Sequence, residues 1–287
     1  MPTMVAGGVH LILAADGNRA FARLPPLNSS AVRRHSDLPR SPSAMHRSDL
    51  IHPATGKLNV ARLHAEAARL RNELLDSQSK MGVDYPHLRL GFDARLTCFA
   101  RLINVLGSFY LGSSFWLNSL LSAKWWQSST NCPVSDRQLL RNEFQQFLKL
   151  GLVHFSFSSV ESSLRVFLRA IDPAAQSGAA AEFKRVYDDL LLRRLSAAKP
   201  TAVELLDMAA RIRNTVHNNG VYFHKSGLDV TQHYKGRSYD FRHGKPVEFA
   251  GWPLLLEITS DLGSVVADIA RDPSIVGIGG EILDPSS

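Results

Sequence analysis

Residues 102–123 contain no charged side chain, and this stretch decides whether the chain can be a membrane protein. Arg101 and Lys124 bound it and two tryptophans follow at 125–126, which is the outline of a membrane span with an interfacial aromatic belt. The stretch also contains seven Asn or Ser residues and two glycines, so its mean hydropathy is low for a lone span. The sequence therefore favours a buried helix pair, broken near Gly112, over a membrane span.

The size and composition of the chain predict a globular protein with one or two compact units. Its 287 residues are 45% hydrophobic, which is enough to bury a substantial core. Cys98 and Cys132 form no CxxC pair and no disulfide framework, so a reducing cytoplasm is the predicted compartment. The formal net charge is +7, of which six Arg and three Asp within residues 1–50 contribute +3. This balance is compatible with a phosphate-containing partner and does not require one.

Residues 1–50 are predicted to form a disordered leader. They are rich in Arg, Ser and Pro and show no helical or strand periodicity beyond a short apolar run. A secretory signal would place a Lys or Arg before that run, and residues 1–10 contain neither. An organellar transit peptide fits the Arg-rich, acid-poor composition better, and a true start near Met45 is a further alternative. The favoured interpretation is a flexible tail with no targeting role.

Apolar residues at helical spacing predict a bundle of about five or six helices. Besides the charge-free stretch, the predicted helices are 58–81, 136–171, 180–195, 202–217 and 252–270. Between them, residues 221–249 alternate and are interrupted by Gly236 and Gly244, which predicts a small β-meander before the last helix. The fold class is therefore mainly α. After the leader, the predicted parts are an N-terminal helical region at 51–130, a helical domain with the meander at 131–272, and a flexible tail at 273–287.

The run Arg-Asn-Thr-Val-His-Asn-Asn-Gly, at residues 213–220, is the sharpest chemical signal in the sequence. Arg213 and His217 are four residues apart, so on a helix their side chains project from one face. A guanidinium offers a fixed fork of donors to a phosphate. An imidazole titrates near neutral pH and can transfer the proton of an attacking hydroxyl or a leaving oxygen. With Asn214 and Asn218 as neutral donors beside them, the pair suits a phosphodiester.

The same residues also have a purely structural interpretation. Near the C-terminal end of a helix, His217 could interact with free carbonyl groups and Arg213 could pair with a carboxylate. Asn-Asn-Gly is a common turn signal, and Gly220 suits the position that stops a helix. Taken without any resemblance, the run favours this interpretation.

A helix with R-N-x-x-H inside a helical bundle resembles the HEPN superfamily, whose members carry an Arg-x4-6-His motif. The resemblance covers residues 136–270 and implies a helical, dimeric, metal-independent ribonuclease of a toxin, antiviral or RNA-processing system. The region is also similar to uncharacterised bacterial proteins in which an R-N-T-aliphatic-H-N-N-G run precedes a small sheet. Five residues separate Arg211 from His217, which is the family's spacing, and three separate Arg213 from it. Because the family places a polar residue after its arginine, and Asn214 follows Arg213, we prefer Arg213 and keep Arg211 as the substitute.

A second polar pair lies in the longest predicted helix, where Glu161 and Arg165 are four residues apart among Phe, Val and Leu residues. A carboxylate in so apolar a setting needs a partner. One interpretation is an intrahelical ion pair worth a few tenths of a kcal/mol. The other has Glu161 orient Arg213 or His217 from a facing helix. The candidate catalytic residues are thus Arg213, His217 and Asn214, and the candidate substrate-binding residues are Arg211, Asn218, Glu161 and Arg165.

The sequence predicts neither a metal site nor a cofactor. His224, His233 and His243 have no ligand spacing, and there is no P-loop, no GxGxxG after a strand and no GxSxG. Two function classes remain open: a metal-independent endoribonuclease, and a non-catalytic helical module that binds a protein or a nucleotide. The predicted partners are RNA, a second copy of the chain in a homodimer with His217 near the interface, and an antitoxin or other protein.

Overall fold

The mainly helical fold predicted from the sequence is confirmed. The computed structural model describes residues 50–52, 56–216 and 218–284, so most of the predicted leader and His217 lie outside the described residues. Within these ranges the α-helices are α1 (Val60–Asp84), α2 (Ala94–Phe115), α3 (Ala123–Ser129), α4 (Arg137–Ile171), α5 (Phe183–Asp189), α6 (Pro200–Val216), α7 (Trp252–Ala270) and α8 (Pro273–Val276).

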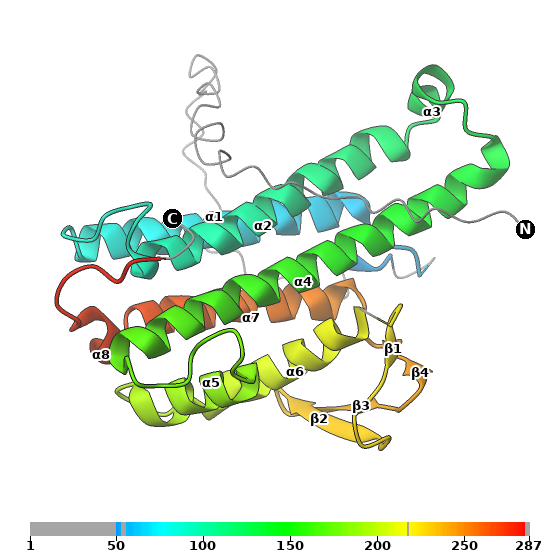
Figure 1. The fold of residues 1–287 in the computed structure, drawn as a ribbon. Helices are drawn as coiled ribbons and strands as arrows, with labels where there is room; N and C mark the ends of the chain where they lie inside the picture. The colour runs from blue at the N-terminus through cyan, green and yellow to red at the C-terminus, as the bar shows by residue number, and fades with distance from the viewer. Residues whose placement is uncertain (1–49, 53–55, 217, 285–287) are drawn as a thin grey trace, which may run out of the picture. The chain divides into compact units, whose positions relative to one another are not determined.

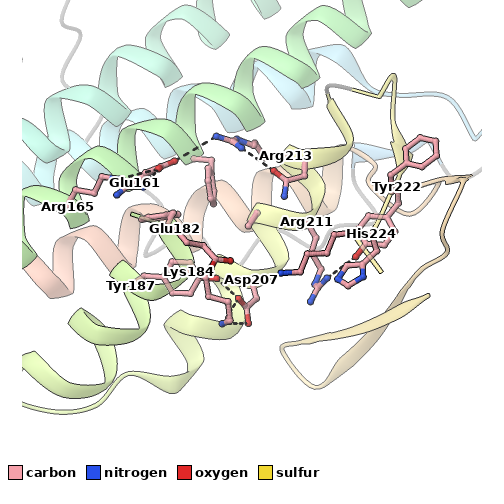
Figure 2. A pocket seen from close by; sticks show the side chains of 16 residues that line it. Glu161, Arg165, Glu182, Lys184, Tyr187, Asp207, Arg211, Arg213, Tyr222 and His224 are labelled. Atoms are coloured by element: carbon pink, nitrogen blue, oxygen red, sulfur yellow. Dashed lines mark hydrogen bonds and ion pairs between the residues drawn. The ribbon is translucent and has the colours of Figure 1, made fainter. Parts of the chain in front are cut away.

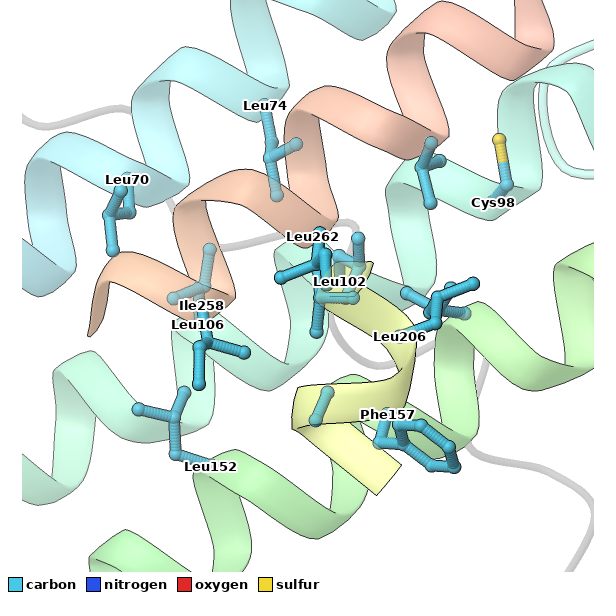
Figure 3. Packing of buried hydrophobic residues seen from close by; sticks show 14 of the residues in the cluster. Leu70, Leu74, Cys98, Leu102, Leu106, Leu152, Phe157, Leu206, Ile258 and Leu262 are labelled. Atoms are coloured by element: carbon cyan, nitrogen blue, oxygen red, sulfur yellow. The ribbon is translucent and has the colours of Figure 1, made fainter. Parts of the chain in front are cut away.

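The long helix α4 runs through the bundle and packs against α2, α5, α6, α7 and α8 (Figure 1). Helices α1 and α2 pack against each other on one side of it, and α7 contacts both of them as well as α4. Helices on both sides of residue 130, predicted as separate regions, therefore share one core. Figure 3 shows part of this core, with side chains that include Leu70 and Leu74 of α1, Leu102 and Leu106 of α2, Leu152 and Phe157 of α4, Leu206 of α6, and Ile258 and Leu262 of α7.

Helix α2 runs without a break over its whole length, so the predicted helix pair broken near Gly112 is wrong. Gly112 instead permits a close approach of α2 to α4, because a Cβ atom there would lie 2.5 Å from a methyl carbon of Leu148. The helix continues into a π-helical turn at Trp116–Leu120, and the stretch is not buried throughout, since Leu111 and Phe115 are exposed. No described helix combines the length and the hydropathy needed to cross a bilayer.

The helices that lead to the candidate motif differ in detail from the prediction. The predicted helix 180–195 is α5 followed by a π-helical turn, Leu190–Arg194. Helix α6 begins at Pro200, earlier than predicted, because proline is well suited to the first helical turn. After α6, Asn219 and Gly220 have φ values of +52° and +84°, left-handed conformations of the kind that commonly end helices.

Short strands follow α6, as predicted, but their pairing is nested. The described strands are β1 (Val221–Tyr222), β2 (Val230–Tyr234), β3 (Arg237–Phe241) and β4 (Lys245–Pro246). Strands β2 and β3 form an antiparallel hairpin. Strand β1 precedes this hairpin in the sequence and β4 follows it, and these two strands pair antiparallel with each other. The predicted meander is therefore two separate strand pairs. Tyr234 and Phe241 are buried, and β1 and β2 lie against α6 (Figure 1).

The segment after α7 is anchored to the bundle, in contrast to the flexible tail predicted at 273–287. The side chain of Asp272 caps α8, and Ile275 within α8 is fully buried. Arg95, itself buried at the start of α2, donates a hydrogen bond to the carbonyl oxygen of Gly280 at 2.6 Å. The Gly- and Pro-rich composition of this segment therefore reflects turns that wrap onto the first residues of α2.

Candidate functional site

A cleft of about 600 Å³ opens between α4, α5, α6 and the segment that begins at β1 (Figure 2). Helices α4 and α6 each contribute polar side chains that the sequence singled out separately. The fold brings five of the seven candidate residues to its walls, namely Glu161, Arg165, Arg211, Arg213 and Asn214. The cleft is therefore the place at which the two predicted polar groups meet.

Arg213 on α6 and Glu161 on α4 face each other in the cleft (Figure 2). Nη2 of Arg213 lies 3.8 Å from Oε2 of Glu161, and Nη1 donates a hydrogen bond to Oδ1 of Asn214 at 3.1 Å. The guanidinium carbon is 5.3 Å from the centre of the Phe157 ring, a cation–π contact. The Arg213 side chain stays 29% exposed. It is thus held over α4 by a long ion pair and a ring face, and it remains accessible to a ligand.

Glu161 also binds Arg165, so both predicted pairings of this carboxylate are present. Oε1 of Glu161 accepts hydrogen bonds from Nε and Nη2 of Arg165 at 3.1 and 2.7 Å. Arg165 in turn donates to the carbonyl oxygens of Gly178 at 2.7 Å and Ala181 at 3.0 Å, in the loop between α4 and α5. The guanidinium of Arg165 therefore has all of its nitrogens bonded to protein groups. Arg165 holds Glu161 and this loop in position.

Arg211 connects α6 to the small strands (Figure 2). Its Nε donates to Oε1 of Gln232 at 3.0 Å, and its Nη1 donates to the hydroxyl oxygen of Tyr222 at 2.9 Å. These bonds join α6 to β1 and β2. Arg211 lines the cleft, but two of its nitrogens donate to groups of the strands. Among the described residues, the side chain of Arg213 makes one hydrogen bond, to Asn214.

The remaining candidates lie at the end of α6. Asn218 is not among the side chains that line the cleft, and its Nδ2 lies 3.5 Å from the carbonyl oxygen of Asn214. The candidate proton-transfer residue, His217, belongs to the residues that the structure does not describe. The structure therefore describes the arginine of the predicted Arg/His pair and not its histidine.

Lys184, Tyr187 and Asp207 form a second polar cluster in the cleft, which was not predicted from the sequence. Asp207 on α6 accepts hydrogen bonds from Nζ of Lys184 at 3.0 Å and from the hydroxyl of Tyr187 on α5. Burial, together with the hydrogen bond to Asp207, raises the pKa of Tyr187 above its usual value, so its hydroxyl stays protonated. A signal was available, because Asp207 precedes Arg211 by four residues and Asn214 by seven, which places the three on one side of α6.

Aromatic rings surround the charged groups. The rings of Phe157 on α4 and Phe183 on α5 meet edge to face at 5.4 Å, and Tyr222 in β1 is a buried part of the lining. Phe223, next along the chain, is 55% exposed. His224 also lines the cleft, with Nδ1 2.6 Å from Oγ of Ser226. Ring faces of this kind can stack on nucleic-acid bases.

Cationic side chains outnumber carboxylates in the lining. The carboxylates are Glu161, Glu182 and Asp207, and the cations are Arg165, Lys184, Arg211, Arg213 and Lys225. A phosphate would find a positive surface with several charged donors here. Within the described ranges, no three His, Cys, Asp or Glu side chains are grouped so that they could hold a metal ion.

Comparisons with known proteins identify no relative from which the role of the cleft could be inferred. No family model matches this sequence. Neither the curated proteins nor the solved structures contain a match to it. The resemblance to the HEPN superfamily thus stays a prediction, carried by residues 213–220.

Replacing Glu161 with alanine is expected to lower the free energy of unfolding by about 1–3 kcal/mol. The substitution leaves Arg165 and Arg213 close together without the carboxylate that both of them contact. Urea denaturation of the variant and the wild type measures the difference. Glu143→Ala, an exposed position on the same helix, is the matched control and should change stability by less than about 0.5 kcal/mol. Equal stability of the two variants would contradict a connecting role for Glu161.

Proposed function

We propose that the protein is a HEPN-like, metal-independent endoribonuclease and that the cleft between α4, α5 and α6 is its active site. The observation that carries the proposal is the position of Arg213. Its partly exposed guanidinium lies in a cleft whose lining holds more cations than carboxylates, beside Asn214 and at the end of the helix that leads to His217. The helical bundle around it agrees with what the resemblance implies.

The proposed reaction is attack of a ribose 2′-hydroxyl on the adjacent phosphorus. Arg213 holds the scissile phosphate, and Asn214 stabilises the charge that develops on its oxygens. His217 accepts the proton of the 2′-hydroxyl. The 2′ oxygen forms a bond to phosphorus as the bond to the 5′ oxygen breaks, and this leaving oxygen takes up a proton from His217 or from His224 of the same cleft. The products are a 2′,3′-cyclic phosphate and a 5′-hydroxyl.

A non-catalytic function is the second candidate, and the ion pair of Arg213 favours it. Because Glu161 and Phe157 both contact the guanidinium, Arg213 could serve to join α6 to α4. In that case the cleft binds a nucleotide or another phosphate-containing ligand without cleaving it. A toxin or antiviral role, with an antitoxin or other protein partner, follows from the family resemblance alone.

Incubation of purified protein with mixed RNA in EDTA separates the two candidates. The wild type should cleave, Arg213→Ala should cleave roughly 100- to 1000-fold more slowly because it loses the phosphate contact, and His217→Ala should lose a similar or larger factor. Thermal melts of all three proteins show whether the variants still fold. Arg62→Ala, on the exposed side of α1, should cleave like the wild type.

Two results would reverse this conclusion. If no protein cleaves and both variants unfold earlier than the wild type, the motif is structural and the non-catalytic function is favoured. If Arg213→Ala cleaves at the wild-type rate, Arg213 does not hold the scissile phosphate.

An exposed apolar face on α2 and α4 supports the predicted homodimer. The rings of Phe115 on α2, Phe144 and Phe147 follow one another at 5.7 and 6.3 Å. Phe147 and Phe155 then border a groove of about 320 Å³ between the two helices. Leu111 on α2 and Leu139 and Leu140 on α4 are exposed as well.

The size of this face argues for a second copy as its partner. Phe147 is 67%, Phe155 60% and Phe115 41% exposed. At about 200 Å² for each side chain, these three expose on the order of 300 Å², which matches the largest apolar patch of a typical monomer before the leucines are added. Two such faces related by a twofold axis would cover each other and form the apolar centre of an interface of about 800 Å² per partner. This face is defined without His217, whose predicted place near the interface stays a prediction.

The double variant Phe147→Glu/Phe155→Glu should convert a dimer into a monomer, because it buries two carboxylates without partners in the interface. Size-exclusion chromatography with light scattering at micromolar concentration measures the change. Leu90→Glu, at an exposed position between α1 and α2, should remain dimeric. A wild type that is monomeric under these conditions would contradict the dimer.

A further inference from the structure

Three cations that the proposed reaction does not use lie in the cleft lining or on the segment that pairs with β1. Lys225 follows β1 and lines the cleft, and Arg242 and Lys245 lie in and after the turn between β3 and β4. All three side chains are exposed. We call Lys225, Arg242 and Lys245 the basic rim.

Backbone contacts hold the two segments of the basic rim together. Lys245 pairs with Tyr222 in the β1–β4 ladder, and the N–H of Gly244 donates to the carbonyl oxygen of Tyr222 at 2.8 Å. One residue before Lys225, the N–H of His224 donates to Nδ1 of His243 at 3.1 Å. The two segments that carry the three cations are therefore held side by side.

The basic rim has no ion-pair partner among the described residues, unlike two of the cations deeper in the cleft. Arg165 and Lys184 are both paired with carboxylates. Of the acidic residues near the rim, Asp229 accepts a hydrogen bond from the backbone N–H of His243 at 2.7 Å, and Asp240 accepts one from Thr231 at 2.8 Å. Because neither carboxylate forms an ion pair with them, the three cationic side chains remain available to an external polyanion.

An exposed aromatic ring, that of Phe223, belongs to the cleft lining two residues before Lys225. Phe223 is 55% exposed, lines the cleft, and meets the ring of His243 edge to face at 5.5 Å. This contact supports one part of Phe223 and leaves its surface available to a ligand. An exposed aromatic ring beside unpaired cations is the arrangement with which proteins bind single-stranded nucleic acid.

We propose that this edge of the cleft is a binding site for single-stranded RNA, in which an unpaired base stacks on Phe223 and the flanking phosphates contact Lys225, Arg242 and Lys245. The inference rests on the proposed function, since it names the substrate of the same cleft. A single strand is specified because stacking on Phe223 needs a base free of its own partners, which a duplex does not offer. The rim then carries the chain of nucleotides that leads away from the scissile phosphate at Arg213.

Binding of a fluorescent 2′-O-methyl oligonucleotide tests this site without cleavage, because the probe lacks the attacking hydroxyl. Anisotropy titrations across a range of salt concentrations give affinity and salt slope. Phe223→Ala should bind about tenfold more weakly. The triple variant Lys225→Ala/Arg242→Ala/Lys245→Ala should reduce the slope of log K against log salt by about 2, because three phosphate contacts of about 0.7 each are lost. Arg62→Ala/Lys80→Ala/Lys124→Ala removes three exposed cations from other parts of the bundle and should keep the wild-type slope.

The outcomes separate this inference from the proposed activity. If no protein cleaves RNA but the rim variants weaken binding as stated, the site stands and the nuclease fails. If the wild type cleaves while both rim variants bind and cleave like it, the nuclease stands and the rim site is overturned. Equal affinity for a duplex of the same length, or full competition by polyglutamate, would also overturn it, because either result indicates a general polyanion surface.

Discussion

Burial of the inward side of α4 is the constraint on which the rest of the structure depends. Its buried side chains between Leu148 and Leu168 face α2, α6 and α7, and Val160, Leu164 and Phe167 are completely buried. Deep apolar burial along several turns fixes both the position and the rotation of a helix. Glu161, next to Val160, is thereby held at the border of the core, where α6 passes. Hydrophobic packing of α4, and not contacts within the cleft, therefore sets the position of the Glu161 carboxylate.

Arg211 and Arg213 of α6 have different partners because they project from different sides of the helix. Residues two apart on a helix point about 200° away from each other. Arg211 consequently reaches Tyr222 and Gln232 in the strands, and Arg213 reaches Glu161 and Phe157 on α4. Arg211 fixes the wall of the cleft that carries the exposed Phe223, and Arg213 presents a partly exposed guanidinium to the cleft. The family spacing alone would favour Arg211, whereas the contacts favour Arg213 as the group free to meet a ligand.

The features that could be predicted from the sequence were those set by neighbouring residues in the chain. Periodicity and flanking Gly or Pro located α4 and α7 almost to the residue, and the i,i+4 spacing located the Glu161–Arg165 pair. Long-range contacts could not be predicted in this way. Gly112 has the appearance of a helix breaker, and only its approach to Leu148 on another helix explains it. The C-terminal segment looks like a tail because its anchor, Arg95, lies far away in the chain. The contact of Glu161 with Arg213 could be named only as one of two alternatives, since it depends on how α4 and α6 pack.

The central claim is that the cleft holds a phosphodiester whose own 2′-hydroxyl is the nucleophile and that no metal ion takes part in the step. The most direct test is mass spectrometry of the ends produced when an oligoribonucleotide is digested in EDTA, beside the same oligonucleotide with one 2′-deoxy sugar at the cleavage position. The result predicted is 2′,3′-cyclic phosphate and 5′-hydroxyl ends from the first, and no cut at the deoxy position in the second. Ends with 3′-hydroxyl and 5′-phosphate, or equal cleavage of both oligonucleotides, would contradict the claim.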